Sequence, residues 1–148
     1  MNAPQAAFVG RSVERREDAR FLTGKGQYTD DITLAGQSYG FFLRSPHAHA
    51  RIRGIDARAA LALPGVHAVV TGKDMPIKYG VIPWTPDENA LALDKVRFIG
   101  DEVAAVAAVD EDTANAALKL IRVDYEPLRA FLEPEDALAN GEPPIHEQ

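Results

Sequence analysis

The feature that most constrains this chain is an uninterrupted apolar run at residues 103–109, directly before a helical pattern. The run reads VAAVAAV and has acidic residues on both sides. A short apolar run bounded by charges is typical of a strand covered on both faces, and its alanines predict very close packing. It is much shorter than the roughly 20 residues that span a membrane. We therefore expect a soluble sheet protein with no membrane span.

The clearest helix is predicted immediately after this strand, from Asp110. Acidic residues lie at its N-terminal end and basic residues near its C-terminal end, the arrangement that the helix dipole favours. Its apolar positions follow the i, i+3, i+4, i+7 spacing of a one-sided helix. These positions are Ala114, Ala117, Leu118 and Ile121.

The remaining elements are short and alternate along the chain. Strands are predicted at residues 39–44, 50–56, 66–71, 96–99 and around 123–125. Helices are predicted at 57–63, capped by Asp56 and stopped by Pro64 and Gly65, and at 134–139. A long loop is expected at 72–91. The order predicts an α+β (mixed α/β) fold, a twisted sheet with two or three helices.

The chain of 148 residues suits one main domain with two flanking segments. Residues 1–26 carry charges and glycines with little periodicity, which predicts an N-terminal arm or lead-in. Residues 27–140 form the predicted domain. Residues 141–148 contain two adjacent prolines and are expected to be an exit linker.

Composition excludes several classes of function. The chain has no cysteine, which excludes disulfides, thiolate metal sites and iron–sulfur ligation within it. The net charge is −6, and the N-terminal arginines alternate with acids, so nucleic-acid binding is not expected. Arg15 and Arg16 are followed by no apolar segment, so we predict no export signal and a cytoplasmic location.

His47 and His49 form the most inviting constellation for chemistry. On an extended backbone residues i and i+2 point to one side, so two imidazoles can approach one metal ion. A metal site needs three or four convergent ligands, and the spacing supplies no third. We therefore predict that these histidines form local hydrogen bonds around Pro46. A small metal-binding protein stays a third hypothesis.

Other candidate motifs lack their required context. The adjacent acids at 30–31, 87–88, 101–102 and 111–112 are interpreted as caps and solvated turns. The glycines around Lys25 open no predicted helix, which argues against a dinucleotide site. Ser38 and Ser45 have no glycine-flanked elbow. Trp84, in the predicted long loop, either packs over the sheet edge or makes a functional contact, and both stay open.

Several segments, matched in order and spacing, resemble the N-terminal region of xanthine dehydrogenase, aldehyde oxidase and carbon monoxide dehydrogenase large subunits. They are residues 9–18, 22–28, 30–32, 44–50 (RSPHAHA), 55–56, 64–66, 96–100 (VRFIG), 103–106 and 123–126 (VDYE). The resemblance implies an α/β hammerhead domain. It also implies that molybdopterin and the catalytic glutamate belong to later domains, and iron–sulfur clusters and FAD to other domains or subunits.

The resemblance thus implies a scaffold and interface domain of a molybdopterin-dependent hydroxylase or dehydrogenase acting on an aromatic, heterocyclic or aldehyde substrate. Its partners would be the remainder of the large subunit and the iron–sulfur and FAD-binding subunits or domains. Residues 79–83, 87–89 and 93–97 look most like the 4-hydroxybenzoyl-CoA reductase large subunit. Glu102 and Arg129 depart from the family's pattern, in which proline is usual at the first position and common at the second.

None of the family's functional residues has a position in this sequence, so no catalytic, cofactor-binding or metal-binding residue is assigned. Interface candidates are Arg44, His47, His49 and Gly100. The strand at 103–109 and the aromatic residues at 41–42 are expected to pack against the rest of the subunit. The alternative is a free-standing, non-catalytic binding or assembly subunit.

Overall fold

The computed structural model describes residues 9–80, 84, 87–139 and 145–146, and the chain divides into two units, Met1–Gln37 and Ser38–Gln148. The first unit contains helix α1 (Asp18–Leu22) and the 3-10 helix η1 (Thr29–Asp31). The rings of Phe21 and Tyr28 stack there at 5.6 Å. The predicted lead-in thus contains one short helix. The domain limits at residues 26 and 140 stay predictions, and most of the predicted exit linker lies outside the described residues.

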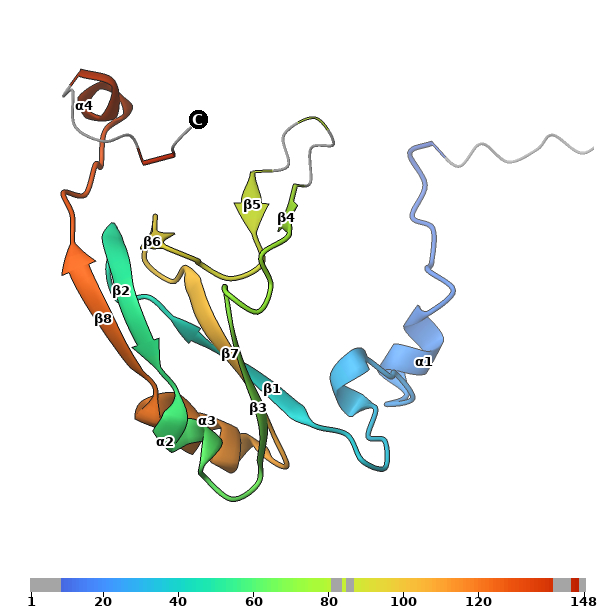
Figure 1. The fold of residues 1–148 in the computed structure, drawn as a ribbon. Coiled ribbons are helices and arrows are strands. Elements are labelled where there is room, and N and C mark those ends of the chain that lie inside the picture. The colour runs from blue at the N-terminus through green and yellow to red at the C-terminus, as the bar shows by residue number, and fades with distance from the viewer. Residues whose placement is uncertain (1–8, 81–83, 85–86, 140–144, 147–148) are drawn as a thin grey trace, which may run out of the picture. The chain divides into compact units, whose positions relative to one another are not determined.

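The second unit contains strands and helices in mixed order (Figure 1). They are β1 (Tyr39–Arg44), β2 (Ala50–Asp56), α2 (Arg58–Leu61), β3 (Val66–Thr71), β4 (Lys78–Tyr79), β5 (Glu88–Asn89), β6 (Lys95–Val96), β7 (Glu102–Ala108), α3 (Glu111–Leu120), β8 (Arg122–Pro127) and α4 (Pro134–Ala139). The α+β class is confirmed. Most predicted bounds agree with these elements to within a residue or two.

The strands form more than the one sheet predicted. The sheets have the orders β1-β7-β3, β6-β2-β8 and β4-β5, and all the strand pairs are antiparallel. The prediction of one sheet was wrong because β1 and β2, although neighbours in sequence, do not pair with each other. Each pairs instead with a strand from the second half of the chain, β1 with β7 and β2 with β8.

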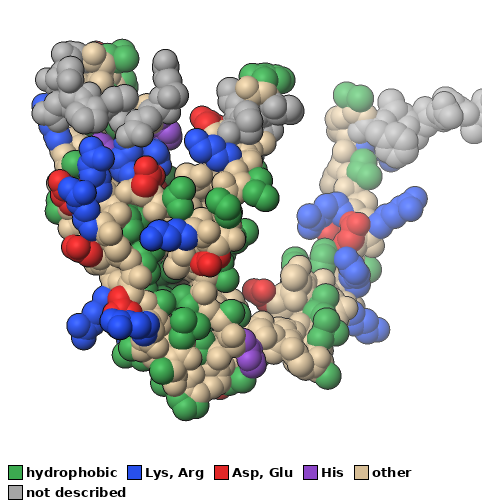
Figure 2. All heavy atoms as spheres, viewed as in Figure 1, with side chains coloured by type: hydrophobic (Ala, Val, Ile, Leu, Met, Phe, Trp, Pro, Cys, Tyr) green, Lys and Arg blue, Asp and Glu red, His purple; other side chains and the backbone are tan. Residues whose placement is uncertain are grey.

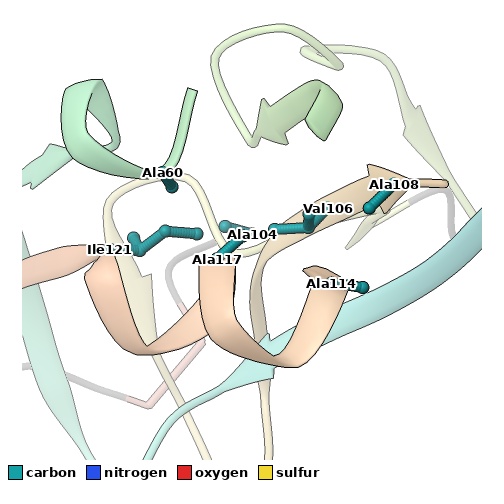
Figure 3. Packing of buried hydrophobic residues seen from close by; sticks show 7 residues of the cluster. All are labelled: Ala60, Ala104, Val106, Ala108, Ala114, Ala117 and Ile121. Atoms are coloured by element: carbon teal, nitrogen blue, oxygen red, sulfur yellow. The ribbon is translucent and has the colours of Figure 1, made fainter. Parts of the chain in front are cut away.

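Strand β7 is the centre of the first sheet. Val106 faces Phe41 of β1 on one side and Val69 of β3 on the other. One face of β7 packs against α3 and α2, and Figure 3 shows its side chains beside the small residues of both helices. The buried cluster consists of Ala60, Ala104, Val106, Ala108, Ala114, Ala117 and Ile121. Because most of these residues are alanines, α3 approaches the sheet closely.

The opposite face of β7 is less covered than predicted. Ala105 and Ala107 are only half-buried, and Phe42 on the neighbouring strand is 51% exposed. The prediction of a strand covered on both faces is therefore wrong for this face of β7. The two helices of this sheet, α2 and α3, pack against the other face.

The predicted amphipathic helix is confirmed in detail. Asp110 is its N-cap, and the carboxylate accepts a 2.7 Å hydrogen bond from the backbone N–H of Thr113. This bond lowers the pKa of Asp110 because it favours the charged carboxylate. The strand, the cap and the helix follow one another without a break, which orients α3 back over β7.

A second buried cluster joins the two three-stranded sheets. It consists of Ala50, Ala92, Val96 and Val103. The strand predicted at 96–99 was wrong, because only Lys95 and Val96 pair with β2 and the chain then turns. On the β2–β8 side, Figure 2 shows Lys and Arg side chains gathered at the surface, and Arg53 there forms an ion pair with Glu126.

The helix predicted at 57–63 is shorter in the structure. It covers Arg58–Leu61 with Ala57 as N-cap, although Asp56 still accepts a 3.1 Å bond from the Arg58 N–H. Gly65 has a φ of +90°, and a Cβ there would lie 2.9 Å from a methyl carbon of Val109. A side chain at position 65 would therefore clash, which favours glycine at the turn before β3.

We expect Ala117→Leu to lower the free energy of unfolding by about 1–3 kcal/mol, because the larger side chain would push α3 away from β7. The neighbouring Ala116 is exposed, so Ala116→Leu is a matched control with little expected effect. Urea titration followed by circular dichroism measures both. Equal effects of the two substitutions would contradict the close packing of α3.

Candidate docking site

The candidate site is built at the corner where β1 ends and β7 begins. Leu43 pairs with Ala104, whereas Arg44 pairs with Glu102, so Val103 is an extra residue that makes a β-bulge. The bulge ends regular pairing, and the side chain of Val103 lies in the second buried cluster. Strand β7 thereby contributes to both cores.

Hydrogen bonds fix the turn between β6 and β7 to the end of β1. The backbone of Ser45 donates to the carbonyl of Asp101 (2.8 Å) and accepts from the N–H of Gly100 (2.9 Å). Arg44 Nη1 donates to the carbonyl of Gly100 (2.9 Å) and to the carboxylate of Glu102. Gly100 has a φ of +93°, which favours glycine at this turn. The structure thus brings Arg44 and Gly100, both predicted interface residues, into direct contact.

The Ser45 hydroxyl has a structural partner rather than a catalytic one. It donates to the carbonyl of His47 (2.9 Å) and accepts from the His47 N–H (3.0 Å). The imidazole of His47 lies edge-on to the Tyr125 ring, with centroids 4.9 Å apart. Burial raises the pKa of the Tyr125 phenol above its ordinary value. His47 thus belongs to the same corner as Arg44.

His49 points to a different part of the chain. Its Nδ1 is 2.8 Å from the carbonyl of Arg129, which can only accept, so Nδ1 carries the proton. Its Nε2 is buried without a partner among the described residues. The prediction of a local hydrogen bond is wrong for the His49 side chain, because 80 residues separate it from Arg129.

The two histidines therefore do not converge. The imidazole of His47 contacts Tyr125, and that of His49 lies near Phe131. Within the described residues no group of three His, Asp or Glu side chains is arranged to hold a metal ion.

Asp101 has a role that the sequence did not reveal. Its carboxylate accepts a 2.9 Å bond from the Arg97 N–H, and burial raises its pKa above the ordinary value. Glu102 is the first residue of β7 and pairs with Arg44. The interpretation of this pair as caps and solvated turns fits Asp101, which accepts a backbone N–H, and is wrong for Glu102, which lies in a strand. The available signal was the position of both acids directly before the apolar run.

A cleft of about 190 Å³ opens beside this corner. Its lining residues come from the β4–β5 hairpin, the β6–β7 turn and the C-terminal segment. They are Tyr79, Asp87, Glu88, Asn89, Ala92, Arg97, Phe98, Asp101, Glu102 and His146. Arg97 donates from Nε to the carbonyl of Ile145 (3.0 Å) and from Nη1 to that of Lys95 (3.2 Å).

This arrangement is suited to binding rather than to bond-breaking. The Ser45 hydroxyl is bonded to backbone groups, the His47 ring contacts Tyr125, and the His49 ring bonds to the carbonyl of Arg129, so these residues form no nucleophile–base pair. Trp84 is exposed, so it does not pack over the sheet edge. No helix in the described part of the chain is long and apolar enough to cross a membrane.

We expect Asp101→Asn to gain stability relative to the natural protein as the pH rises. Burial holds the pKa of Asp101 above its ordinary 3.8, so the folded chain binds more protons than the unfolded chain above pH 3.8. The free energy of unfolding of the natural protein therefore falls as the pH rises through the folded pKa. Asparagine removes this fall and keeps an oxygen that accepts the Arg97 N–H.

Urea titrations at about pH 4, close to the ordinary carboxyl pKa, and at about pH 7, well above it, measure this difference. Asp94→Asn, which removes an exposed carboxyl group, is the control. A deficit of Asp101→Asn that grows as the pH rises would contradict the burial of this carboxyl.

Comparison with known proteins identifies relatives of the whole described fold. The family model for the aldehyde oxidase and xanthine dehydrogenase a/b hammerhead domain matches residues 23–129. The chain is 44% identical to the carbon monoxide dehydrogenase large chain of Afipia carboxidovorans, over 94% of this chain and 18% of that protein. It is 42% identical to the xanthine dehydrogenase molybdenum-binding subunit of Escherichia coli O157:H7, over 84% of this chain and 18% of that subunit.

A solved structure agrees with these sequence matches. Quinoline 2-oxidoreductase from Pseudomonas putida 86 is similar with a TM-score of 0.78 and 42% identity, over 88% of this chain and 18% of that one. The chain thus spans less than a fifth of the length of these relatives. The resemblance inferred from the sequence is confirmed: this chain belongs to the aldehyde oxidase and xanthine dehydrogenase family, as its a/b hammerhead domain.

Proposed function

We propose that the chain is the scaffold and docking domain of the large subunit of a molybdopterin-dependent hydroxylase or dehydrogenase. The observation that carries this proposal is the family match over residues 23–129 together with the small share of each relative that is covered. A relative named as a molybdenum-binding subunit is among the matches. The rest of such a subunit would supply the catalytic centre.

The residues of this chain do not fit the cofactors of such an enzyme. The sequence has no cysteine for an iron–sulfur cluster. The described residues hold no cluster of three metal-ligating side chains, and the orphaned His49 Nε2 stands alone. No step of the reaction is therefore assigned to this chain. Molybdopterin, iron–sulfur clusters and FAD are proposed for the remainder of the large subunit and for partner subunits or domains.

The proposed substrate class is aromatic, heterocyclic or aldehyde. The names of relatives support this range, since they include a xanthine dehydrogenase subunit and a quinoline oxidoreductase, besides a carbon monoxide dehydrogenase. The finer proposal, 4-hydroxybenzoyl-CoA reductase, is supported only by the sequence pattern at residues 79–97. A cytoplasmic location is likewise a proposal from the sequence.

The contacts of the corner support a docking role. Arg44, Ser45 and Gly100 fix the β6–β7 turn through three backbone-directed hydrogen bonds, so the surface around it is held in one conformation. A fixed surface loses little conformational entropy when a partner covers it. The alternative is a free-standing assembly subunit. It would use the same corner, but it would not have to be part of a longer polypeptide.

The test is to purify the endogenous protein that carries this sequence and to measure its subunit mass, molybdenum and iron together. We expect a chain about five times longer than this one, because relatives are covered to 18%, and we expect it to contain molybdenum. A subunit of about 16 kDa without either metal would contradict the proposal and favour the free-standing assembly subunit.

A further inference from the structure

The turn between β6 and β7 exposes two adjacent apolar side chains. Phe98 is 55% exposed and Ile99 is 71% exposed. The turn itself is not loose, because the Gly100 N–H donates to Ser45 and the Asp101 N–H donates to the carbonyl of Phe98. These hydrogen bonds hold the turn in a conformation in which both apolar side chains are exposed. The protein therefore gains no stability from burying them. Such an arrangement is typical of a preorganised contact surface.

A second aromatic ring lies on the same cleft. Tyr79 lies in β4, whereas Phe98 lies in the turn between β6 and β7. Tyr79 is 50% exposed, and both rings line the cleft. Exposed aromatic rings are frequent anchors of protein interfaces, since they bury much area with few rotatable bonds. We call Tyr79, Phe98 and the neighbouring Ile99 the apolar rim; Tyr79 and Phe98 line the cleft, and Ile99 follows Phe98 in the turn outside the lining.

The charge of the cleft is complementary to a basic partner. Four carboxyl residues line it, Asp87, Glu88, Asp101 and Glu102, together with Arg97 and His146. Arg44, outside the lining, pairs with Glu102, and the carboxyl residues still outnumber the two arginines. Arg97 directs Nε and Nη1 to backbone carbonyls. A lysine or arginine side chain entering beside the rings would gain both cation–π contact and charge-assisted hydrogen bonds.

We propose that the apolar rim and these carboxylates form the docking surface for a basic segment of the rest of the large subunit, with one arginine or lysine side chain in the cleft. This inference rests on the proposed function. Its occupant follows from two observations: the cleft has a surplus of negative charge, and most of each relative lies outside the part that this chain covers.

A second copy of the chain is a poorer occupant. In a two-fold contact the same surface meets itself, so carboxylates would face carboxylates. The net charge of −6 adds to this repulsion. A basic segment of the same polypeptide removes the repulsion and also covers Phe98 and Ile99.

The experiment uses the full-length subunit as purified from its source organism, with the photo-reactive p-benzoylphenylalanine in place of Phe98. The matched control carries it in place of Leu61 on α2, which is 52% exposed and lies outside the cleft. After irradiation, mass spectrometry identifies the cross-linked peptides. Because both positions are exposed, neither replacement disturbs the buried clusters.

We expect position 98 to cross-link to a peptide of the same polypeptide beyond residue 148 that contains arginine or lysine. Asp87→Lys should reduce this cross-link, because it places a like charge beside the incoming one. Asp124→Lys, at an exposed position of β8, should leave it unchanged.

Three results would overturn the docking surface: a cross-link to a second copy or to another subunit, a cross-linked peptide without basic residues, or no more cross-linking at position 98 than at position 61. A subunit that ends at 148 residues would instead overturn the proposed function, and its mass alone would reveal this. The two failures are therefore distinguishable.

Discussion

Close packing of alanines between β7 and α3 is the interaction on which the rest of the structure depends. Ala104 and Ala108 of β7 and Ala114 and Ala117 of α3 are fully buried in one cluster. Because these side chains are small, the helix lies near the sheet, in which β7 pairs with β1 on one edge and with β3 on the other. The same strand begins with a bulge at Val103, which belongs to the second cluster. One strand therefore joins the two cores and positions the corner.

The corner where β1 ends and β7 begins connects this core to the protein surface. Arg44 of β1 and the following Ser45 form hydrogen bonds with Gly100 and Asp101, which join the turn between β6 and β7 to the end of β1. Phe98 nevertheless remains exposed on that turn. In the function that we propose, this fixed backbone with exposed apolar side chains is the surface that the domain offers to the remainder of the large subunit.

Local patterns predicted most elements of this fold, and long-range contacts explain the errors. The strands at residues 39–44, 50–56 and 66–71 and the helix capped by Asp110 were predictable because alternation and capping are local signals. The division into two three-stranded sheets was not, since strand partners are chosen between distant segments. Arg44 and Gly100 were expected near an interface, but the contact between them depends on the bulge. The bond of His49 to Arg129 has no local signal at all.

The most direct test compares amide hydrogen exchange in the full-length subunit and in the chain of residues 1–148. We expect the amides of β7 to be equally protected in both, because their partners β1 and β3 lie within this chain. We also expect residues 97–101 to be better protected in the full-length subunit, where a partner segment covers them. Loss of protection in β7 of the short chain, or equal protection of the turn in both proteins, would contradict a self-contained scaffold that docks through this corner.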